Sequence, residues 1–440
     1  MCPNPIAGLN LSCHPLELHK YMQWKPPTNY SDKRMADLIE NDCERFRQLF
    51  CFPTLPLSVE ESEYSLAFSM LAHENAENVI RIFQSLYWPQ NVYCLTWDSK
   101  SSSEFKRALR AFVSCINSAV RRPNLIIAPT ELSVAWGDSS ILKATLMCME
   151  QLLKVRRTGE FQWKYHQYLT GVDFPLRTNL EMVQIFKTLN GANDIELRED
   201  EPLRRSYATF RQQTLKPGYY IAAITAGGIK KPFADGVNWY RGTNQIALTA
   251  DTVEWLMTSD VAKNLLQYLD GTFLPEETYF ATLLQNEQLA APGHFPGRCL
   301  RKYVGERRKP WFSRYSIVGV EQSSSRRCQS RHWRQALCIF GVLDLPDLYR
   351  RPHLIAHKLT IDFQPATQYC LAYSHWQRTY GQWTQPRLAF PIDLNVTFGD
   401  LPAVKWRELR EKFKGKLNEQ QFYQEFLDAK GCGKGVEPSS

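Results

Sequence analysis

Two aspartates follow predicted strands at the point where each strand ends. Asp98 comes directly after the run Val92–Trp97, and Asp173 follows Tyr165–Thr170, with Gly171 permitting a tight turn. Open α/β sheets bind ligands beyond the carboxyl ends of their strands, where a carboxylate can accept hydrogen bonds from a ribose or a base. Either aspartate would serve equally well as a helix cap or a solvated loop residue. The pattern alone leaves both roles open.

A pair of glutamates begins a predicted helix further along the chain. In the run 272–284, Pro275 occupies the first helical position. Glu276 and Glu277 then lie in the first turn, where the helix dipole stabilises negative charge. A carboxylate held on such a rigid element can act as a general base. Acidic residues are also common at helix starts for structural reasons, so position alone does not decide between the two roles.

Alternating strands and helices are predicted to position these residues. The last helix of the series begins with a Thr178–Glu181 capping box and stops at Asn190-Gly191. The predicted strands cover 64–71, 92–97, 125–128 and 165–170, and the helices cover 79–87, 105–113, 141–153 and 178–189. This alternation is typical of an α/β fold whose mostly parallel sheet is flanked by helices.

The flanking regions follow this pattern less closely. Residues 1–62 are polar and proline-rich, with a short helical stretch over 35–50. Four further elements are predicted after Gly191: strands over 239–248 and 337–343, a helix opened by an Asp251–Glu254 capping box, and a basic amphipathic helix over 406–427.

Charge and length limit the class of protein. The chain has 440 residues and a net charge of +8, with many arginines between Arg298 and Arg351. Such an excess suits an anionic partner, which could be nucleic acid, a sulfated glycan or a nucleotide diphosphate, although a solvated basic face explains most of these arginines equally well. No recognisable nucleic-acid-binding motif accompanies the charge.

Cysteines and sequons indicate the compartment. Twelve cysteines are dispersed without a C-x-x-C pair, which argues against a zinc ribbon or a redox motif. The sequons at Asn10, Asn29 and Asn395 fit passage through the secretory route as N-glycosylation sites. No apolar run approaches the ~18 residues that span a bilayer, and Met1 does not open a signal peptide.

An ordered set of motifs carries a family resemblance. The runs are SLAFSMLAH, YWPQNVYCLTWD, LMCMEQLL, GVDFPLRTN with NGANDIE, LPEETYFATL, ALCIFGVLDL and HLIAHKL. From about Tyr64 to Cys370 the chain resembles the core-2/I-branching β-1,6-N-acetylglucosaminyltransferases, glycosyltransferase family 14. The resemblance implies a GT-A-type fold with a Rossmann-like, mostly parallel sheet flanked by helices. It also implies a stem over 1–62, a catalytic domain over 63–380 and a C-terminal extension over 381–440.

The resemblance assigns roles to individual residues. Leu274-Pro275-Glu276-Glu277 aligns with the family's S-P-D-E motif, which makes Glu277 the catalytic base. Glu196 and Arg204 fall where the family binds the acceptor, although Arg204 is a loose match. The residues expected to bind the UDP-sugar donor are His73, Asp98, Trp136, Asp173, Arg334 and Lys358.

Two departures from the family pattern affect these assignments. SRYSIVGVEQSSS lacks the family's Trp-x-Tyr pair, which packs on the acceptor, so the identity of the acceptor stays open. Arg334 matches the diphosphate-binding arginine only if one residue is inserted before Cys338.

The implied chemistry is sugar transfer without a metal cofactor. The sequence has no Asp-x-Asp motif to hold an ion, and Arg334 and Lys358 can stabilise a leaving diphosphate instead. A single base, Glu277, implies inversion, with GlcNAc passing from UDP-GlcNAc in β-1,6 linkage to an O-glycan core acceptor. The alternatives are a protein O-xylosyltransferase, another UDP-sugar transferase such as one using UDP-glucose, an inactive lectin-like descendant that binds glycans, and an arginine-rich nucleic-acid binder.

The resemblance also predicts disulfides and location. The implied pairs are Cys13–Cys370, Cys43–Cys115, Cys94–Cys148 and Cys328–Cys338, whereas Cys2, Cys51, Cys299 and Cys432 have no assigned partner. Family members are type II Golgi membrane proteins, so this chain is expected in the Golgi lumen, or secreted if it has no anchor. The expected partners are the UDP-sugar and a glycoprotein acceptor, with a homodimer possible and no nucleic acid.

Overall fold

The structure is a computed structural model that describes residues 2–199, 206–216, 219–229, 233, 237–297, 308–309, 311–319, 327–380, 398, 401–413 and 421. The chain divides into two compact units. The first comprises Met1–Leu132, Gln151–Phe186 and Phe312–Leu394, and the second Ser133–Glu150, Lys187–Trp311 and Asn395–Ser440. Each unit is described by itself.

A parallel sheet forms the centre of the first unit. Its strands are β1 (Leu66–Ala72), β2 (Val92–Trp97), β3 (Leu125–Ile127) and β4 (Tyr165–Thr170), in the order β4-β1-β2-β3. All of these pairs are parallel, with Ala67 opposite Val92 and His166. Every residue of β2 is buried, as expected for a strand covered on both faces. The predicted α/β architecture is therefore confirmed.

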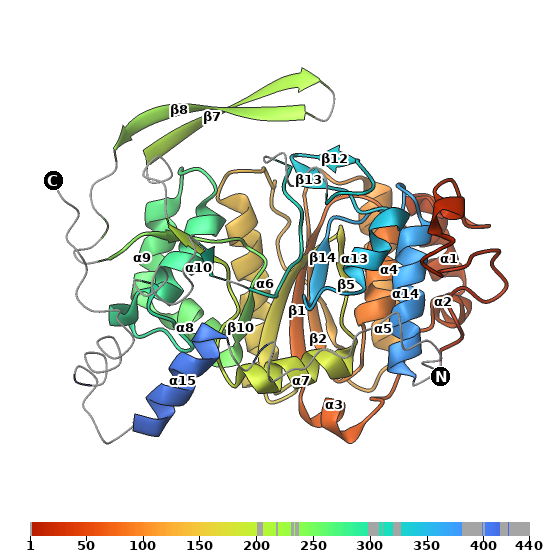
Figure 1. Cartoon of the computed structure of the whole chain (residues 1–440), viewed down its shortest axis with the longest axis horizontal. Helices are drawn as coiled ribbons and strands as arrows, with labels where there is room; N and C mark the ends of the chain where they lie inside the picture. The colour runs from red at the N-terminus through yellow and green to blue at the C-terminus, as the bar shows by residue number, and fades with distance from the viewer. Residues whose placement is uncertain are drawn as a thin grey trace. The chain divides into compact units, whose positions relative to one another are not determined.

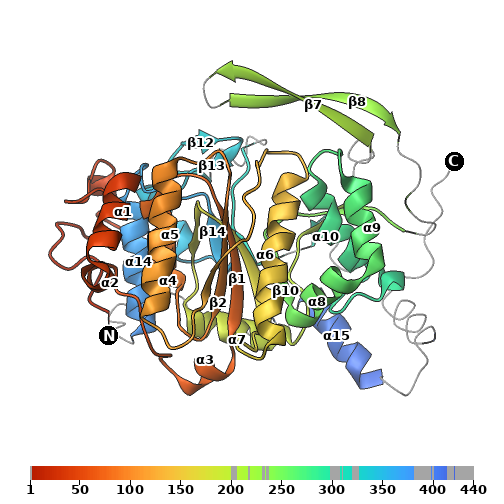
Figure 2. The same cartoon turned by 180° about the vertical axis from the view of Figure 1, so that it is seen from behind.

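Helices follow these strands as the patterning predicts. They are α4 (Ala76–Leu86), α5 (Ser103–Ser118), α6 (Ser140–Arg157) and α7 (Asn179–Leu189). Figures 1 and 2 show α4, α5 and α14 (Ala366–Thr379) gathered to one side of β1 and β2. The predicted capping box of α7 forms, because Glu181 N donates to Thr178 Oγ1 (3.2 Å) and Thr178 N donates to Glu181 Oε2 (2.9 Å).

Two small antiparallel pairs complete the first unit. β5 (Asp173–Pro175) pairs with β14 (Ile355–His357), and β12 (Trp333–Arg334) pairs with β13 (Leu337–Cys338). The predicted turn at Gly171 is present, but Asp173 then begins a strand and is not part of the turn. The predicted strand over 337–343 is also too long. It ends at Cys338, and the chain then turns into a 3₁₀ helix, η5 (Val342–Asp344), and a short helix, α13 (Leu345–Leu348).

Disulfides tie the N-terminal segment to the rest of the first unit. This segment contains η1 (Leu18–Tyr21), α1 (Asp32–Asn41), α2 (Cys43–Phe50) and α3 (Val59–Glu63). The predicted helical stretch over 35–50 divides at Asp42, whose side chain accepts from Arg45 N (2.9 Å) and caps α2.

Three of the implied disulfide pairs are present. They are Cys13–Cys370, Cys43–Cys115 and Cys328–Cys338, and a further bond joins Cys2 to Cys51. Cys94 and Cys148 are each disulfide-bonded. Cys299 and Cys432 lie outside the described residues.

The second unit combines short strands with a group of helices. Its strands are β6 (Leu197–Glu199), β7 (Ser206–Lys216), β8 (Tyr219–Ile229), β9 (Tyr240–Arg241), β10 (Ala247–Thr249) and β11 (Arg308–Lys309). Its helices are α8 (Ala250–Thr258), α9 (Asp260–Leu269), α10 (Pro275–Gln285), η3 (Glu287–Leu289) and α15 (Pro402–Phe413). β6 pairs with β9 and β11, and β7 and β8 form a hairpin.

Three local predictions in this unit are wrong. The strand predicted over 239–248 is two short strands, β9 and β10. Thr249, and not Asp251, caps α8, which begins at Ala250. The Thr249 side chain accepts a hydrogen bond from Thr252 N (3.1 Å). The helix predicted from Trp406 begins at Pro402 and its described part ends at Phe413.

None of the helices in the described ranges is long and apolar enough to cross a membrane.

Candidate active site

A short hairpin presents Arg334 in the first unit. Gln335 and Ala336 link β12 to β13 with positive φ angles of 52° and 59°, as a two-residue type I′ turn requires. The Cys328–Cys338 disulfide fixes the base of this hairpin. Arg334 therefore sits at the last strand position before a rigid tip, with its side chain half-exposed.

Lys358 follows directly after β14 and faces the same hairpin. Its Nζ donates to Gln335 Oε1 over 3.0 Å. Burial, together with the positive charges of Arg334 and Arg314, lowers the pKa of Lys358 to about 8. Arg334 and Arg314 are thus close enough to repel the Lys358 ammonium, so an anion that binds in this cluster would relieve that repulsion. Arg314 is a member of the cluster that sequence reasoning missed.

Asp173 and His357 form a buried pair beside this cationic cluster. Asp173 Oδ1 lies 2.6 Å from His357 Nδ1, and Oδ2 accepts from Thr170 N over 2.6 Å. Burial lowers the pKa of His357 to about 4, so the ring is neutral at pH 7 and donates its Nδ1 proton to the carboxylate. Asp173 is fully buried, with both oxygens bonded to protein groups. Its predicted donor role would therefore be exerted through His357 and β14.

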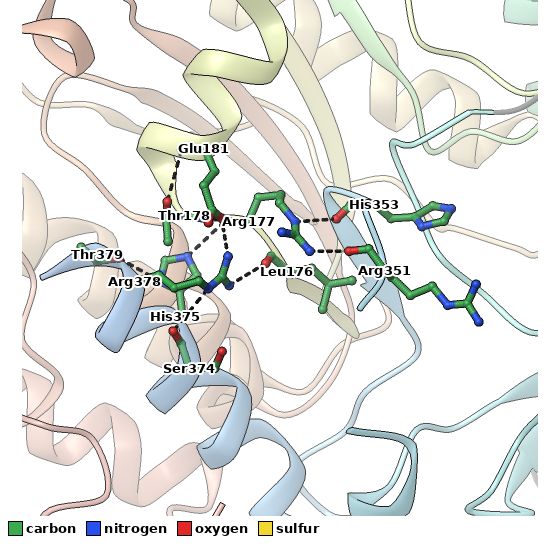
Figure 3. Close-up of polar contacts among 10 residues, drawn as sticks. All are labelled: Leu176, Arg177, Thr178, Glu181, Arg351, His353, Ser374, His375, Arg378 and Thr379. Carbon is green, nitrogen blue, oxygen red and sulfur yellow. Dashed lines mark hydrogen bonds and ion pairs between the residues drawn. The ribbon is translucent and has the colours of Figure 1, made fainter. Parts of the chain in front are cut away.

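A network of buried arginines holds the segment that precedes β14 (Figure 3). The Arg177 guanidinium donates to the carbonyl oxygens of Arg351 and His353, just before β14. Arg378 on α14 pairs with Glu181 on α7 and donates to Leu176 O over 2.8 Å. Burial lowers the pKa of Arg177 to about 10, and the nearby Arg378 lowers it further. This network joins three elements and fixes the segment that leads to Lys358.

Glu74 is a second residue that sequence reasoning missed. Its Oε1 lies 3.1 Å from Arg334 Nη1 and 3.3 Å from His73 Nε2. The hydrogen bond from His73, together with Arg334, lowers the pKa of Glu74 to about 2. The structure thus links the predicted donor residues His73 and Arg334 through a carboxylate. A histidine and a glutamate directly after the first strand were the available signal.

Asp98 lies at the end of β2, as predicted. Its carboxylate accepts from Lys100 N (2.9 Å) and pairs with Lys100 Nζ (2.7 Å), while its own N–H donates to Ala72 O (3.2 Å) at the end of β1. Ser101 Oγ donates to His73 O over 2.7 Å, so the loops after β1 and β2 are joined. The structure therefore brings the regions of Asp98 and His73 together.

In the second unit, α10 begins with the two predicted glutamates. Leu274 precedes the helix in the left-handed region (φ 50°), and Pro275 occupies its first turn. The Glu276 side chain is buried (5% exposed), whereas Glu277 is partly exposed. Of the two carboxylates, Glu277 is the one that a substrate hydroxyl could reach.

Gly242 connects Glu277 with Glu196, the predicted acceptor-binding residue. Gly242 N donates to Glu277 O over 2.7 Å. A Cβ atom on Gly242 would lie 2.1 Å from Glu196 O, so only glycine permits this approach. The Glu196 carboxylate is buried and pairs with Arg198. The main-chain carbonyl groups of Glu196 and Glu277 thus both lie against one glycine, which sequence reasoning did not identify.

Trp136 lies beside the start of α10. Its half-exposed ring packs edge-on against Phe273, with 5.5 Å between the ring centroids. Leu274 N donates to Gly137 O over 2.8 Å. The predicted donor-binding tryptophan therefore shares the second unit with Glu277, not the first unit with Arg334 and Lys358. Arg204 and Asn395 lie outside the described residues.

One side-chain cluster has metal-ligand composition. Cys328, Cys338 and Asp344 lie close together in the described part of the chain. The two sulfurs form a disulfide and so offer no thiolate, and Asp344 accepts from Gly341 N and Gln329 N. This cluster does not fit a metal ion.

The α/β fold with its parallel sheet, the cationic cluster and the carboxylate at a helix start agree with an enzyme of the glycosyltransferase class. Residues 66–347 match the Core-2/I-Branching enzyme family, and the chain belongs to that family.

Similar proteins are β-1,6-N-acetylglucosaminyltransferases. The chain is 31% identical over 349 residues to the mouse (Mus musculus) beta-1,3-galactosyl-O-glycosyl-glycoprotein beta-1,6-N-acetylglucosaminyltransferase 3, covering 77% of this chain and 75% of the relative. It is 30% identical over 360 residues to the human (Homo sapiens) N-acetyllactosaminide beta-1,6-N-acetylglucosaminyl-transferase, covering 81% and 83%. It is 29% identical over 382 residues to the Danio rerio beta-1,3-galactosyl-O-glycosyl-glycoprotein beta-1,6-N-acetylglucosaminyltransferase 4, covering 84% of each chain.

Proposed function

We propose that this enzyme transfers N-acetylglucosamine from UDP-GlcNAc, in β-1,6 linkage, to an O-glycan core. The observation that carries the proposal is the cluster of Arg334, Lys358 and Arg314, whose mutual repulsion a bound diphosphate would relieve. The printed activities of the relatives supply the sugar and the linkage.

In this mechanism the two groups of residues divide the chemistry. Arg334 and Lys358 bind the diphosphate and stabilise the charge that develops as the glycosidic bond breaks. Glu277 takes the proton of the acceptor's 6-hydroxyl as its oxygen attacks the anomeric carbon. UDP leaves with the bonding electrons, and the single displacement inverts the anomeric centre. No metal ion takes part in this scheme.

The location follows from the same proposal. Asn10 and Asn29 are exposed, so both sequons are open to glycosylation. Together with the disulfides, they support a place in the Golgi lumen or in secretion. Binding of a second copy, as a homodimer, stays a prediction.

A panel assay tests the proposal. The full chain is incubated with UDP-GlcNAc, UDP-xylose and UDP-glucose against O-glycan core, lactosamine and serine-peptide acceptors, and the product linkage is determined by NMR. A β-1,6-linked GlcNAc product is expected. A xylosylated peptide or a glucosyl product would assign a different donor. Absence of UDP binding would indicate an inactive, glycan-binding descendant. Steep salt-dependent binding to RNA would indicate a nucleic-acid-binding protein.

A further inference from the structure

A cavity of about 430 Å³ lies within the first unit, and none of the candidate site residues lines it. Its walls come from the N-terminal segment, from α4 and from α14, which both views place together (Figures 1 and 2). A volume of this size is typical of small-molecule sites.

Covalent and hydrogen bonds hold this cavity open before any ligand arrives. The Cys2–Cys51 disulfide forms part of its wall, and Cys13–Cys370 ties the same N-terminal segment to α14. Trp376 Nε1 donates to Cys2 O over 2.8 Å. A ligand would therefore meet a preformed site and would not bear the cost of ordering the segment.

The electrostatics of the lining favour a neutral ligand. Arg81 is the one charged side chain among the cavity-lining residues. Glu77 Oε1 accepts from its Nε (2.8 Å) and Nη2 (2.7 Å), so the charge is compensated. The other lining residue able to ionise near neutral pH, His375, is held neutral by burial, which lowers its pKa to about 4. An anion would find no uncompensated cation here.

One polar atom of this pair is still available to a ligand. Glu77 Oε2 already accepts from Tyr30 N over 2.8 Å, and Arg81 Nη1 has no hydrogen-bond partner within the described ranges. The guanidinium lies 4.5 Å from the Tyr369 ring centroid and 5.5 Å from that of Phe50. A wholly apolar ligand would cover Nη1 without satisfying it, which is unfavourable.

The remaining wall contains both aromatic rings and neutral polar groups. Tyr30, Trp376 and Tyr380 are half-exposed there, beside the amides of Asn4 and Gln84. A sugar ring has apolar C–H faces and a rim of hydroxyl or amide oxygens, and it matches such a surface. We propose that this cavity binds a neutral sugar residue of a glycan chain, separately from the site of transfer.

Titration calorimetry with a neutral disaccharide tests the proposal. N,N′-diacetylchitobiose is the probe, because it lacks the galactosyl group that the relatives' names specify for acceptors. The full chain should bind it saturably and with the same affinity in the presence of UDP. Ala372→Trp on α14 and Thr28→Trp on the N-terminal segment both fill the cavity and should weaken binding by about tenfold or more. Leu16→Trp is the matched control, because Leu16 is 79% exposed and outside the cavity.

Unchanged UDP affinity shows that each variant is folded. If Ala372→Trp does not fold, Thr28→Trp, which changes an exposed residue, still decides the question. The proposal is overturned if the wild-type chain shows no saturable binding, or if neither filled variant weakens it. It is also overturned if the apolar probe 1-aminoanthracene binds and the disaccharide fails to displace it. Because these arms do not require transfer, failure of the proposed function would be seen separately, as loss of UDP binding and of product.

Discussion

Individual residues carry the proposed chemistry through their exposure and their charged neighbours. Glu277 is partly exposed in the first turn of α10, and Glu276 beside it is buried. Lys358 is a cation whose pKa of about 8 lies close to neutral pH. The first property predicts which residue acts as base, and the second predicts a pH dependence.

Glu277→Gln should abolish most of the transfer while leaving UDP binding intact. Glutamine keeps the shape of the side chain and cannot accept the proton, so kcat should fall by about 10²–10⁴-fold. Glu276→Gln is the matched control and should retain far more activity, because its side chain points elsewhere. Initial rates and UDP titrations measure both variants. An inactive Glu276→Gln beside an active Glu277→Gln would mean that the alignment is displaced by one residue.

UDP affinity should fall as pH rises through the pKa of Lys358. The folded-state pKa is lowered, so the ammonium that binds the diphosphate is present below about pH 8 and is lost above it. Each further pH unit should reduce the protonated fraction of free enzyme about tenfold, until the neutral form limits binding. Lys358→Arg is the control, because arginine stays charged over this range and should give a flat profile. A sloping profile in that variant would assign the titration to another group.

Elements determine where these residues are held. The β12–β13 hairpin carries Arg334, Lys358 directly follows β14, and the Arg177–Glu181–Arg378 network fixes the segment that precedes β14. In the second unit, the close approach at Gly242 holds β9 against α10 and against the chain at Glu196. Changes to these elements should alter function without removing any reacting group.

Replacing both Cys328 and Cys338 by serine should weaken UDP binding several-fold. The disulfide closes a short loop, so its removal loosens the hairpin that carries Arg334 more than it lowers the stability of the fold. Calorimetry and thermal melting separate the two effects. Unchanged UDP affinity in a folded double variant would show that the hairpin does not depend on the bond.

Gly242→Ala should impair the second unit and leave UDP binding unchanged. The added Cβ would lie 2.1 Å from Glu196 O, so the backbone must shift, at an estimated cost of about 1–3 kcal/mol. Because Gly242 N also donates to Glu277 O, we expect a lower kcat together with a lower melting temperature. Gly8→Ala is the control for a glycine-to-alanine substitution without a steric clash, because nothing lies within 4 Å of the Gly8 Cβ position. The φ angle of 73° at Gly8 adds local backbone strain to this control. Wild-type kcat and stability in Gly242→Ala would contradict this account.

The whole molecule combines a basic charge with a cationic cluster in the first unit and the proposed base, Glu277, in the second. The net charge of +8 does not by itself indicate nucleic acid, because the proposed function uses three of these cations to bind a smaller anion. This distribution of charge bears on the role of metal ions.

Transfer should continue in excess EDTA. Arg334, Lys358 and Arg314 can supply the electrostatic stabilisation that a divalent ion gives elsewhere. Rates measured with EDTA and rates measured with added Mn²⁺ should agree within about twofold. Arg334→Ala should weaken UDP binding about tenfold or more, through loss of a charge-assisted hydrogen bond. Activity that EDTA abolishes and Mn²⁺ restores would require a different diphosphate site.

The sequence by itself determined the regular part of the fold. Strand β2, the α7 capping box and the alternation of the four parallel strands with the helices that follow them could be predicted because they depend on local periodicity and on cap chemistry. The family motifs added three disulfide pairs and the candidate residues Glu277, Arg334 and Lys358. These are properties of short runs of residues, and such runs carry their own signal.

Only the tertiary structure decided which groups meet. Glu74 meets Arg334 across 260 positions of sequence, and Asp173 meets His357 across 184, so no local pattern records either contact. Thr249 displaced Asp251 as the cap of α8, because backbone geometry selects the residue whose extended conformation places its side chain over the first turn. Burial likewise separated Glu276 from Glu277, and the cavity beside α14 is lined by segments that the Cys2–Cys51 and Cys13–Cys370 disulfides join. Contacts between distant residues depend on how the elements pack, and packing is a property of the folded chain.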